Sequence, residues 1–285
     1  MNHSTDFIEF ADGMDLFLKQ YGNNDIIRNY YGNYYEAKKH LKGMAKDARQ
    51  AVKFKLPDNG QIIDLKGRES FKATYEPYVP VIKLPYDVIV LEFEYLSNIG
   101  VPTPMIVICK QLEDRIEFEA ATDMSQVVPN YEGSIWVSTT RRPNVIKGQW
   151  DNLLLDFNQF EDEPNQDKKE SLIKNELSYL YVMMEFLAAM SCQNISTVDE
   201  IPDKKMNEKR KKKKLTPFFT YKVLTVNTQL GTASEETGLG SSHASPRVHM
   251  RRGHIRRLKN KTVWVNQCIV GDKTKGVVIK DYNVV

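Results

Sequence analysis

The apolar positions at the start of the chain recur at the spacing of an α-helix. Between 5 and 21 the spacing is near-helical for Phe7, Ile8, Met14, Leu16, Phe17 and Leu18. Gly22 with the two asparagines after it is a stop signal. We therefore predict a helix over 5–21, with Thr5 or Asp6 as its N-cap. A second helix is predicted over 24–50, where tyrosines come first and lysines and alanines follow.

From residue 52 the pattern changes to the two-residue alternation of β-strands. Turn-forming residues separate the apolar runs, and the later runs are joined by short connections, which favours an antiparallel meander. The predicted strands cover 53–56, 61–65, 71–75, 88–96, 104–113, 115–122 and 133–140.

Charged residues alternate with apolar ones in the middle of this sheet. Ile116, Phe118 and Ala120 alternate with Glu117 and Glu119, which indicates a sheet with one face in water. The pair Glu92 and Glu94 has the same spacing of two. Such carboxylates could also serve as paired acids and bases or as metal ligands. No histidine or second acidic cluster accompanies them in the sequence, so we interpret all four as solvated.

The most strongly helical segment covers 167–194. Asp167 is a suitable N-cap, with Glu170 three residues later in the position of a capping box. The second half of the segment is apolar on nearly every side, which is typical of a buried helix. We predict that it packs beneath the sheet as the central core helix.

The last third of the chain alternates basic segments with strands. An edge strand is predicted over 195–201, then a lysine-rich loop or arm over 202–217, a strand over 218–226 and a long loop over 227–242. Three further strands are predicted for the segment HIRRL and for 262–271 and 276–284, so the end of the chain should form a small antiparallel β unit.

These elements predict an α+β fold in three regions. An N-terminal helical region covers 1–50, and an α+β core with the antiparallel sheet and the long helix covers 51–201. The basic arm and the C-terminal antiparallel β unit, with a His/Arg loop, cover 202–285.

Composition places the chain among globular proteins of the cytoplasm. Apolar residues make up 41% and charged residues 27% of the 285 residues. No run of apolar residues is long enough for a membrane span. Three cysteines lie far apart and fit neither a disulfide framework nor a zinc finger, which indicates a reducing compartment. The first residues do not resemble a secretory signal.

Charge is distributed very unequally along the chain. Residues 1–203 carry 21 Lys and Arg against 32 Asp and Glu, whereas residues 204–285 carry 19 against 5. A basic part of this kind either binds a polyanion or docks on an acidic surface, of the same chain or of a second copy.

The densest group of chemically active side chains lies in 240–271. Its arginines can hold phosphate or carboxylate through their planar guanidinium groups, and the preceding lysines would add attraction to nucleic acid. The alternative is structural, with the arginines pairing to acids of the first part. The candidate binding residues are Lys209, Arg210, Lys211, Lys212, Lys213, Lys214, Arg247, Arg251, Arg252, Arg256 and Arg257.

The histidines of the same stretch suggest two sharper hypotheses. His249 and His254 could act as an acid–base pair in phosphoryl transfer, because histidine titrates near neutrality. His243, with these two and Cys268, could bind zinc, but the spacings match no common zinc module. We favour histidines satisfied by hydrogen bonds in a polar loop, and we expect neither a metal nor a cofactor.

The string SSHASPRVHMRRGHIRRLKNKTVWVNQCIVG, with KGVVIKDYNV near the end, resembles the C-terminal signature of a broad family of tailed-phage and prophage proteins. A lysine- and arginine-rich loop before a strand similar to FFTYKVLTV is expected in that family, as here. The resemblance covers the last third of the chain and, more loosely, 167–194 with the strands before it. It implies a phage gene product in the bacterial cytoplasm, an accessory protein of host takeover or counter-defence, and it carries over no catalytic role.

Three functions follow. The first, which we favour, is a phage accessory protein that binds and inhibits or redirects a host defence or regulatory complex. The second is a nucleic-acid-binding protein of phage replication or transcription, with contacts over 204–261. The third is a His/Arg-dependent nuclease or transferase. A host protein complex is the expected partner, with a homo-oligomer as a further option and no membrane contact.

Overall fold

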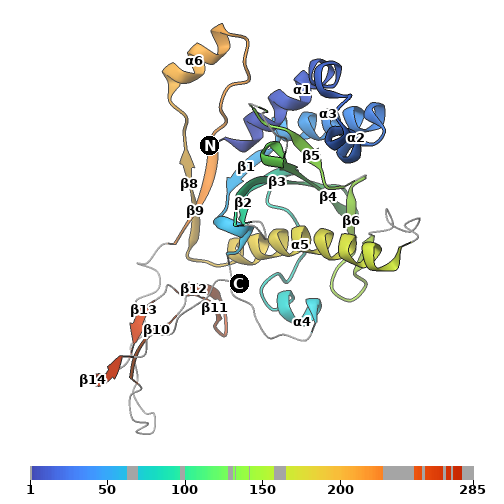
Figure 1. Cartoon of the computed structure of the whole chain (residues 1–285). Coiled ribbons are helices and arrows are strands. Elements are labelled where there is room, and N and C mark those ends of the chain that lie inside the picture. Colours follow the sequence, from blue (N-terminus) through green and yellow to red (C-terminus); the bar gives the residue numbers. More distant parts are fainter. Residues whose placement is uncertain are drawn as a thin grey trace.

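The chain has an α+β fold in which helices cover both faces of one large sheet (Figure 1). The structure is a computed structural model. It describes residues 2–62, 70–96, 100–127, 131, 133–140, 142–156, 165–226, 247–251, 254–265, 268–270 and 272–277.

Three helices open the chain: α1 (His3–Tyr21), α2 (Asp25–Tyr31) and α3 (Tyr34–Gln50). The N-cap of α1 is Asn2, so the prediction of Thr5 or Asp6 was wrong. The single helix predicted over 24–50 is also wrong, because the chain breaks at Gly32 and Asn33. Gly32 adopts a positive φ of 53°, and the Asn33 side chain accepts hydrogen bonds from the first backbone N–H groups of α3.

The sheet has nine strands in the order β7-β6-β4-β3-β2-β1-β9-β8, with β5 paired to β4. Strands β2, β3 and β4 form the predicted antiparallel meander. The bounds are β1 (Val52–Lys55), β2 (Val88–Leu96), β3 (Pro102–Gln111), β4 (Arg115–Asp123), β5 (Trp136–Ser138), β6 (Asn144–Lys147), β7 (Leu154–Asp156), β8 (Ile195–Glu200) and β9 (Tyr221–Val226).

The sheet is mixed, which corrects the prediction of an antiparallel sheet. Strand β1 runs parallel to both of its neighbours, β2 and β9. Parallel pairing requires a long crossover, and the chain between β1 and β2 supplies one. This connection contains the 3₁₀ turn η1 (Asp58–Gly60) and the short helix α4 (Phe71–Tyr75), while a second 3₁₀ turn, η2 (Ser125–Val127), follows β4.

Two of the predicted early strands are not found as strands. Residues 71–75 form α4, because the Ser70 hydroxyl accepts a hydrogen bond from the Ala73 N–H and starts a helical turn. Of the strand predicted over 61–65, residues 61 and 62 have no regular structure and the rest lie outside the described residues.

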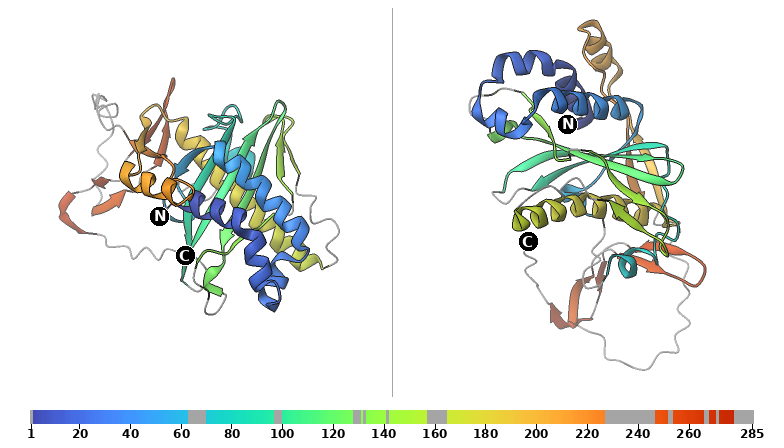
Figure 2. Two further views of the ribbon diagram at one scale, coloured as in Figure 1. Left: turned by 90° about the horizontal axis from the view of Figure 1, so that it is seen from above. Right: turned by 90° about the vertical axis from the view of Figure 1, so that its right-hand side faces the viewer.

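One face of the sheet packs on α5 (Gln166–Met190), which ends four residues before the predicted boundary. Leu180 and Phe186 from its second half are fully buried there, against strand residues that include Leu91, Phe118 and Val107. Figure 2 shows α5 beneath the sheet and α1–α3 above it.

The other face is covered by α1–α3, so the prediction of a face in water is wrong. Val90, Ile106 and Ile108 point to these helices and are buried in a second core with residues such as Phe7 of α1. Glu92 is 2% exposed, and the Glu119 side chain is 14% exposed. Charged residues at alternate strand positions therefore lie beneath helices here.

The C-terminal strands differ from the predicted antiparallel unit. The strand predicted over 218–226 is β9, a member of the main sheet. In the rest, β10 pairs antiparallel with β13 but parallel with β14, and β11 pairs with β12 as a hairpin. The bounds are β10 (Arg247–Arg251), β11 (His254–Arg257), β12 (Thr262–Val265), β13 (Cys268–Val270) and β14 (Asp272–Val277).

The remaining parts of the C-terminal prediction lie largely outside the described residues. These are the loop over 227–242 and most of the strand over 276–284. Among the described residues, no helix is both long enough and apolar enough to cross a membrane.

The burial of the second half of α5 predicts that an alanine substitution there lowers the free energy of unfolding far more than one at an exposed leucine. Replacing Leu180, which is fully buried, by alanine removes packed methyl groups and leaves a cavity, so we expect a loss of about 2–5 kcal/mol. The control is Leu16→Ala on α1, because Leu16 is 70% exposed. Equal midpoints of urea unfolding for the two variants would contradict the core position of α5.

Glu176 on α5 predicts a pH-dependent stability. Burial raises the pKa of its carboxyl to about 7, partly offset by a hydrogen bond from Asn144 Nδ2 at 2.6 Å. The folded state then binds more protons than the unfolded state between the ordinary pKa and 7, so stability falls as pH rises through that window. Glu176→Gln removes this loss, and above pH 7 the variant should be more stable by on the order of 1–3 kcal/mol.

The measurement is urea unfolding of the wild type and the variant between about pH 4 and 8, a range that covers the titration of Glu176 in the unfolded and in the folded state. Exposed Glu113→Gln serves as the control with the same chemical change. A difference between Glu176→Gln and the wild type that stays constant with pH would refute the raised pKa.

Candidate functional site

A protrusion from the sheet carries the basic block of the sequence. Strands β8 and β9 are antiparallel neighbours at the edge of the sheet, and α6 (Lys204–Lys212) connects them beyond the body of the molecule (Figure 1). The predicted loop or arm is therefore mostly a helix. Asp203 caps its N-terminus, and the cations of its last turn face the negative end of the helix dipole.

The inner side of α6 is fixed to the chain that returns to β9. Asn207 makes two hydrogen bonds with the backbone of Phe218, at 2.7 and 2.9 Å. Arg210 donates to the Thr216 carbonyl at 2.7 Å, and its guanidinium lies over the Phe218 ring. A further ion pair joins Arg210 to Glu9 of α1 at 2.6 Å. Arg210, a predicted binding residue, thus holds the protrusion in place.

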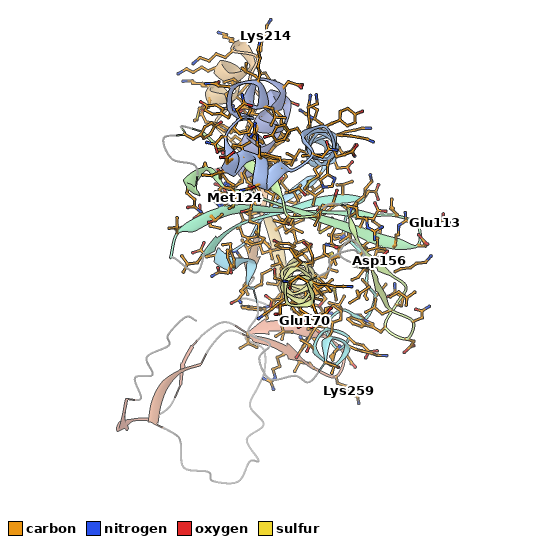
Figure 3. All side chains as sticks on the ribbon, turned by 45° about the vertical axis from the view of Figure 1, so that its right-hand side comes forward. Glu113, Met124, Asp156, Glu170, Lys214 and Lys259 are labelled. Carbon is orange, nitrogen blue, oxygen red and sulfur yellow. The ribbon has the colours of Figure 1, made fainter. Side chains whose placement is uncertain are left out.

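The exposed side of α6 is mostly lysine, with Met206 and Glu208 as the other exposed residues of the helix. Lys205, Lys209 and Lys212 are spaced by four and three, so they form one stripe, opposite Asn207 and Arg210. Figure 3 shows Lys214 at the tip of the protrusion. Within the described part of the chain, no acidic side chain lies at ion-pair distance from the seven exposed lysines Lys204, Lys205, Lys209, Lys211, Lys212, Lys213 and Lys214.

The predicted His/Arg loop is a set of strands. Arg247, His249 and Arg251 lie in β10, where His249 pairs with Val270. His254, Arg256 and Arg257 lie in β11, where His254 pairs with Val265. The two histidines therefore belong to separate sheets, and strand pairing does not bring them opposite one another. Arg256 is exposed, and Arg252 lies outside the described residues.

The β11–β12 hairpin is held on the body by Asn194, four residues after the end of α5. The Asn194 amide donates to the Trp264 carbonyl at 2.7 Å and accepts from the Trp264 N–H at 2.6 Å. The Gln193 N–H adds a bond to the Thr262 carbonyl, and Ile255 is buried in the core beneath. These contacts fix Arg256 and the turn that follows it.

The two basic regions lie at opposite ends of the molecule. Lys214 at the tip of α6 and Lys259 in the turn of the β11–β12 hairpin are far apart in Figure 3, with the sheet and α5 between them. The described basic residues of 204–261, for which the sequence predicts a nucleic-acid contact, therefore do not form one continuous surface.

A polar cluster between α3 and the sheet was missed by sequence reasoning. His40 Nε2 lies 3.0 Å from Ser138 Oγ and 3.3 Å from Glu119 Oε1. Burial raises the pKa of Glu119 to about 7 and lowers that of His40. In a Ser-His-acid triad the serine and the acid contact different ring nitrogens. Here both contact Nε2, so the cluster has binding groups but not the geometry of an activated serine.

This cluster had no signal in the sequence. His40 stands alone in a lysine-rich helix, Ser138 is in a short strand, and Glu119 belongs to an alternating pattern typical of a wet face. No group of three or more His, Cys, Asp or Glu suited to a metal ion occurs among the described residues. His243 of the zinc hypothesis lies outside them.

No protein-family model matches the chain, and no curated protein or solved structure matches it. The functional proposals therefore rest on the sequence and the geometry of this chain itself.

The Asn194 contact predicts how firmly the β11–β12 hairpin is held. Asn194→Ala removes both hydrogen bonds to Trp264 and leaves two partly buried backbone groups without this partner, so the hairpin should become about 1–3 kcal/mol less protected against exchange. Gln193→Ala is the control, because Gln193 uses only its backbone N–H. Amide hydrogen exchange at Trp264 is the measurement, and equal exchange rates in the two variants would contradict the contact.

Proposed function

We propose that the chain binds nucleic acid through the α6 protrusion. The observation that carries the proposal is the set of seven exposed lysines on α6 and its C-terminal turn, without acidic partners in the described part of the chain. Like charges gathered on one short helix repel one another, so a polyanion that neutralises them is bound favourably.

The ion pairs argue against a purely internal use of this charge. The acidic first part of the chain reaches the protrusion through Glu9, which pairs with Arg210. Asp199 of β8 pairs with Lys222 of β9, at the base of the protrusion. These contacts position α6 and leave the lysine stripe in solvent. If the basic block docked on the acidic residues of the same chain, its lysines would instead form ion pairs with them.

The chemistry of the surface favours contacts with phosphates over reading of bases. Lysine is a compact point charge, whereas arginine has the planar fork suited to bidentate recognition. The one arginine of α6 faces inward. Binding through Lys205, Lys209 and Lys212 should therefore be nearly independent of sequence and strongly dependent on salt.

A second proposal rests on the resemblance of 240–271 to tailed-phage proteins. On that basis we propose that the chain acts in an infected bacterial cell, as an accessory protein that inhibits or redirects a host defence or regulatory complex. The β11–β12 hairpin carries the exposed Arg256, and its turn, marked by Lys259 in Figure 3, lies away from α6. This supports the proposal, because a partner can contact the hairpin while α6 remains free.

The lysine stripe predicts a salt-dependent loss of binding. The triple variant Lys205→Gln, Lys209→Gln and Lys212→Gln should weaken binding about tenfold or more at moderate salt. It should also reduce the slope of log Kd against log salt by about 2 to 3. Fluorescence anisotropy with labelled single- and double-stranded DNA and RNA is the measurement.

The matched control neutralises three exposed lysines elsewhere, Lys19, Lys83 and Lys174, with the same change of net charge. It should keep the slope of the wild type. If the wild type binds none of the four nucleic acids at low salt, or if both triple variants lose affinity equally, the proposal is wrong.

A further inference from the structure

Strand β8 is the outermost strand on one side of the main sheet (Figure 1). It pairs with β9 in an unbroken antiparallel register, from Ile195 opposite Val226 to Glu200 opposite Tyr221. Among the described strands, no other pairs with it. The strand at the opposite edge, β7, has only three residues and offers few free backbone groups. The longer β8 offers a row of unpaired N–H and C=O groups along its outer side.

This edge exposes apolar side chains. Val198, in the middle of β8, is 56% exposed, and Ile201, directly after the strand, is 75% exposed. Exposed β-branched residues on an edge favour pairing with a further strand, whose side chains remove them from water. Lysine, proline and bulges are the usual protections of an edge strand. The six residues of β8 include neither lysine nor proline, and its register with β9 has no bulge.

The two acids of β8 are compensated within the same chain. Asp199 Oδ1 lies 2.8 Å from the ammonium of Lys222 on β9. Glu200 Oε2 lies 3.8 Å from the ammonium of Lys55 on β1. A charge on an edge strand repels a strand of like charge, but here each carboxylate has a lysine from its own sheet beside it. The edge is therefore apolar at its centre and balanced in charge at its end.

We infer that the β8 strands of two copies of this chain pair antiparallel, with Val198 of one copy opposite Val198 of the other. A two-fold axis perpendicular to the sheet passes through this pair, and the two sheets continue into one another. The register also places Ile195 opposite Ile201, Thr197 opposite Asp199, and Ser196 opposite Glu200.

The sequence of β8 selects a second copy and this register. Apolar residues meet apolar residues, and no two acids lie opposite one another. With the axis at Asp199, two identical carboxylates would be directly opposite, which is destabilising. With the axis at Thr197, Ile195 would be opposite Asp199 and Val198 opposite Ser196, so the apolar pairs would be lost. A contact between two identical surfaces requires self-complementarity of this kind.

The pairing also brings the two basic regions together across the copies. Strand β8 begins directly after Asn194, which holds the β11–β12 hairpin, and leads at its other end to α6. Because the paired strands run in opposite directions, the end that leads to α6 lies beside the start of β8 in the second copy. The α6 protrusion of one copy and the hairpin of the other are then at the same end of the dimer. This consequence rests on the proposed function, whereas the pairing itself does not.

The experiment is sedimentation velocity of the full chain without nucleic acid, over a range of micromolar concentrations. We expect an equilibrium of monomer and dimer that changes little with salt, because backbone hydrogen bonds and apolar contacts hold the dimer. A monomer at every concentration up to about 100 µM overturns the inference. It would leave this edge to a strand of another protein.

Two variants at the two-fold axis test the register. Val198→Lys and Val198→Glu each place like charges directly opposite, so each should weaken the dimer at least about tenfold. An equal mixture of the two variants should associate again, because lysine of one copy then lies opposite glutamate of the other. Leu154→Lys is the matched control, since Leu154 is 65% exposed on the opposite edge strand. It should dimerise like the wild type.

Three results would show that the inference is wrong. These are unchanged dimerisation of Val198→Lys, an equal loss in Leu154→Lys, and a mixture of Val198→Lys and Val198→Glu that does not associate. Thermal unfolding of each variant reports on the fold, and misfolded chains would not associate on mixing. The triple lysine variant of α6 should dimerise like the wild type, so the dimer and the nucleic-acid proposal fail independently. A monomeric triple variant would also overturn pairing through β8.

Discussion

The buried carboxylate of Glu92 holds together three parts of the chain that are distant in sequence. It lies in β2 and accepts hydrogen bonds from the backbone N–H groups of His3 and Ser4, at 3.2 and 2.7 Å, and from the Tyr221 hydroxyl at 2.5 Å. The first turn of α1 and strand β9 are therefore tied to the centre of the sheet. A carboxylate without these donors would be costly in this position, because burial raises its pKa.

The polar cluster and the α6 protrusion both depend on this arrangement. Beside Glu92, the Lys53 ammonium donates to the Ala48 and Ala51 carbonyls at the end of α3, and burial lowers its pKa to about 8. Glu92 attracts this cation, so the end of α3 is tied to the same centre. Helix α3 carries His40 of the polar cluster, while α1 supplies Glu9 to Arg210 of α6. A change at Glu92 should thus disturb both regions together.

The periodic elements could be predicted from the sequence, and the contacts between them could not. Helix α1 and strands β2 to β4 were found because each has one long, regular apolar pattern. Glu119 was placed in water because alternation shows that a residue faces away from one core, but not that helices cover the other face. The parallel pairing of β1 depends on strands 33 and more residues away, for which local patterns give no signal.

Only part of the candidate interface could be predicted from the sequence, for the same reason. The lysines of α6 could be found from the sequence because a dense run of one residue type is a local feature and does not depend on contacts with distant residues. The role of Arg210 depends on Glu9 and Phe218, so composition grouped it with the lysines although it faces inward. Arginine, with its rigid fork, makes the fixed contacts that orient the protrusion, and lysine leaves its charge in solvent. This division explains how one basic block can be both well anchored and free to bind.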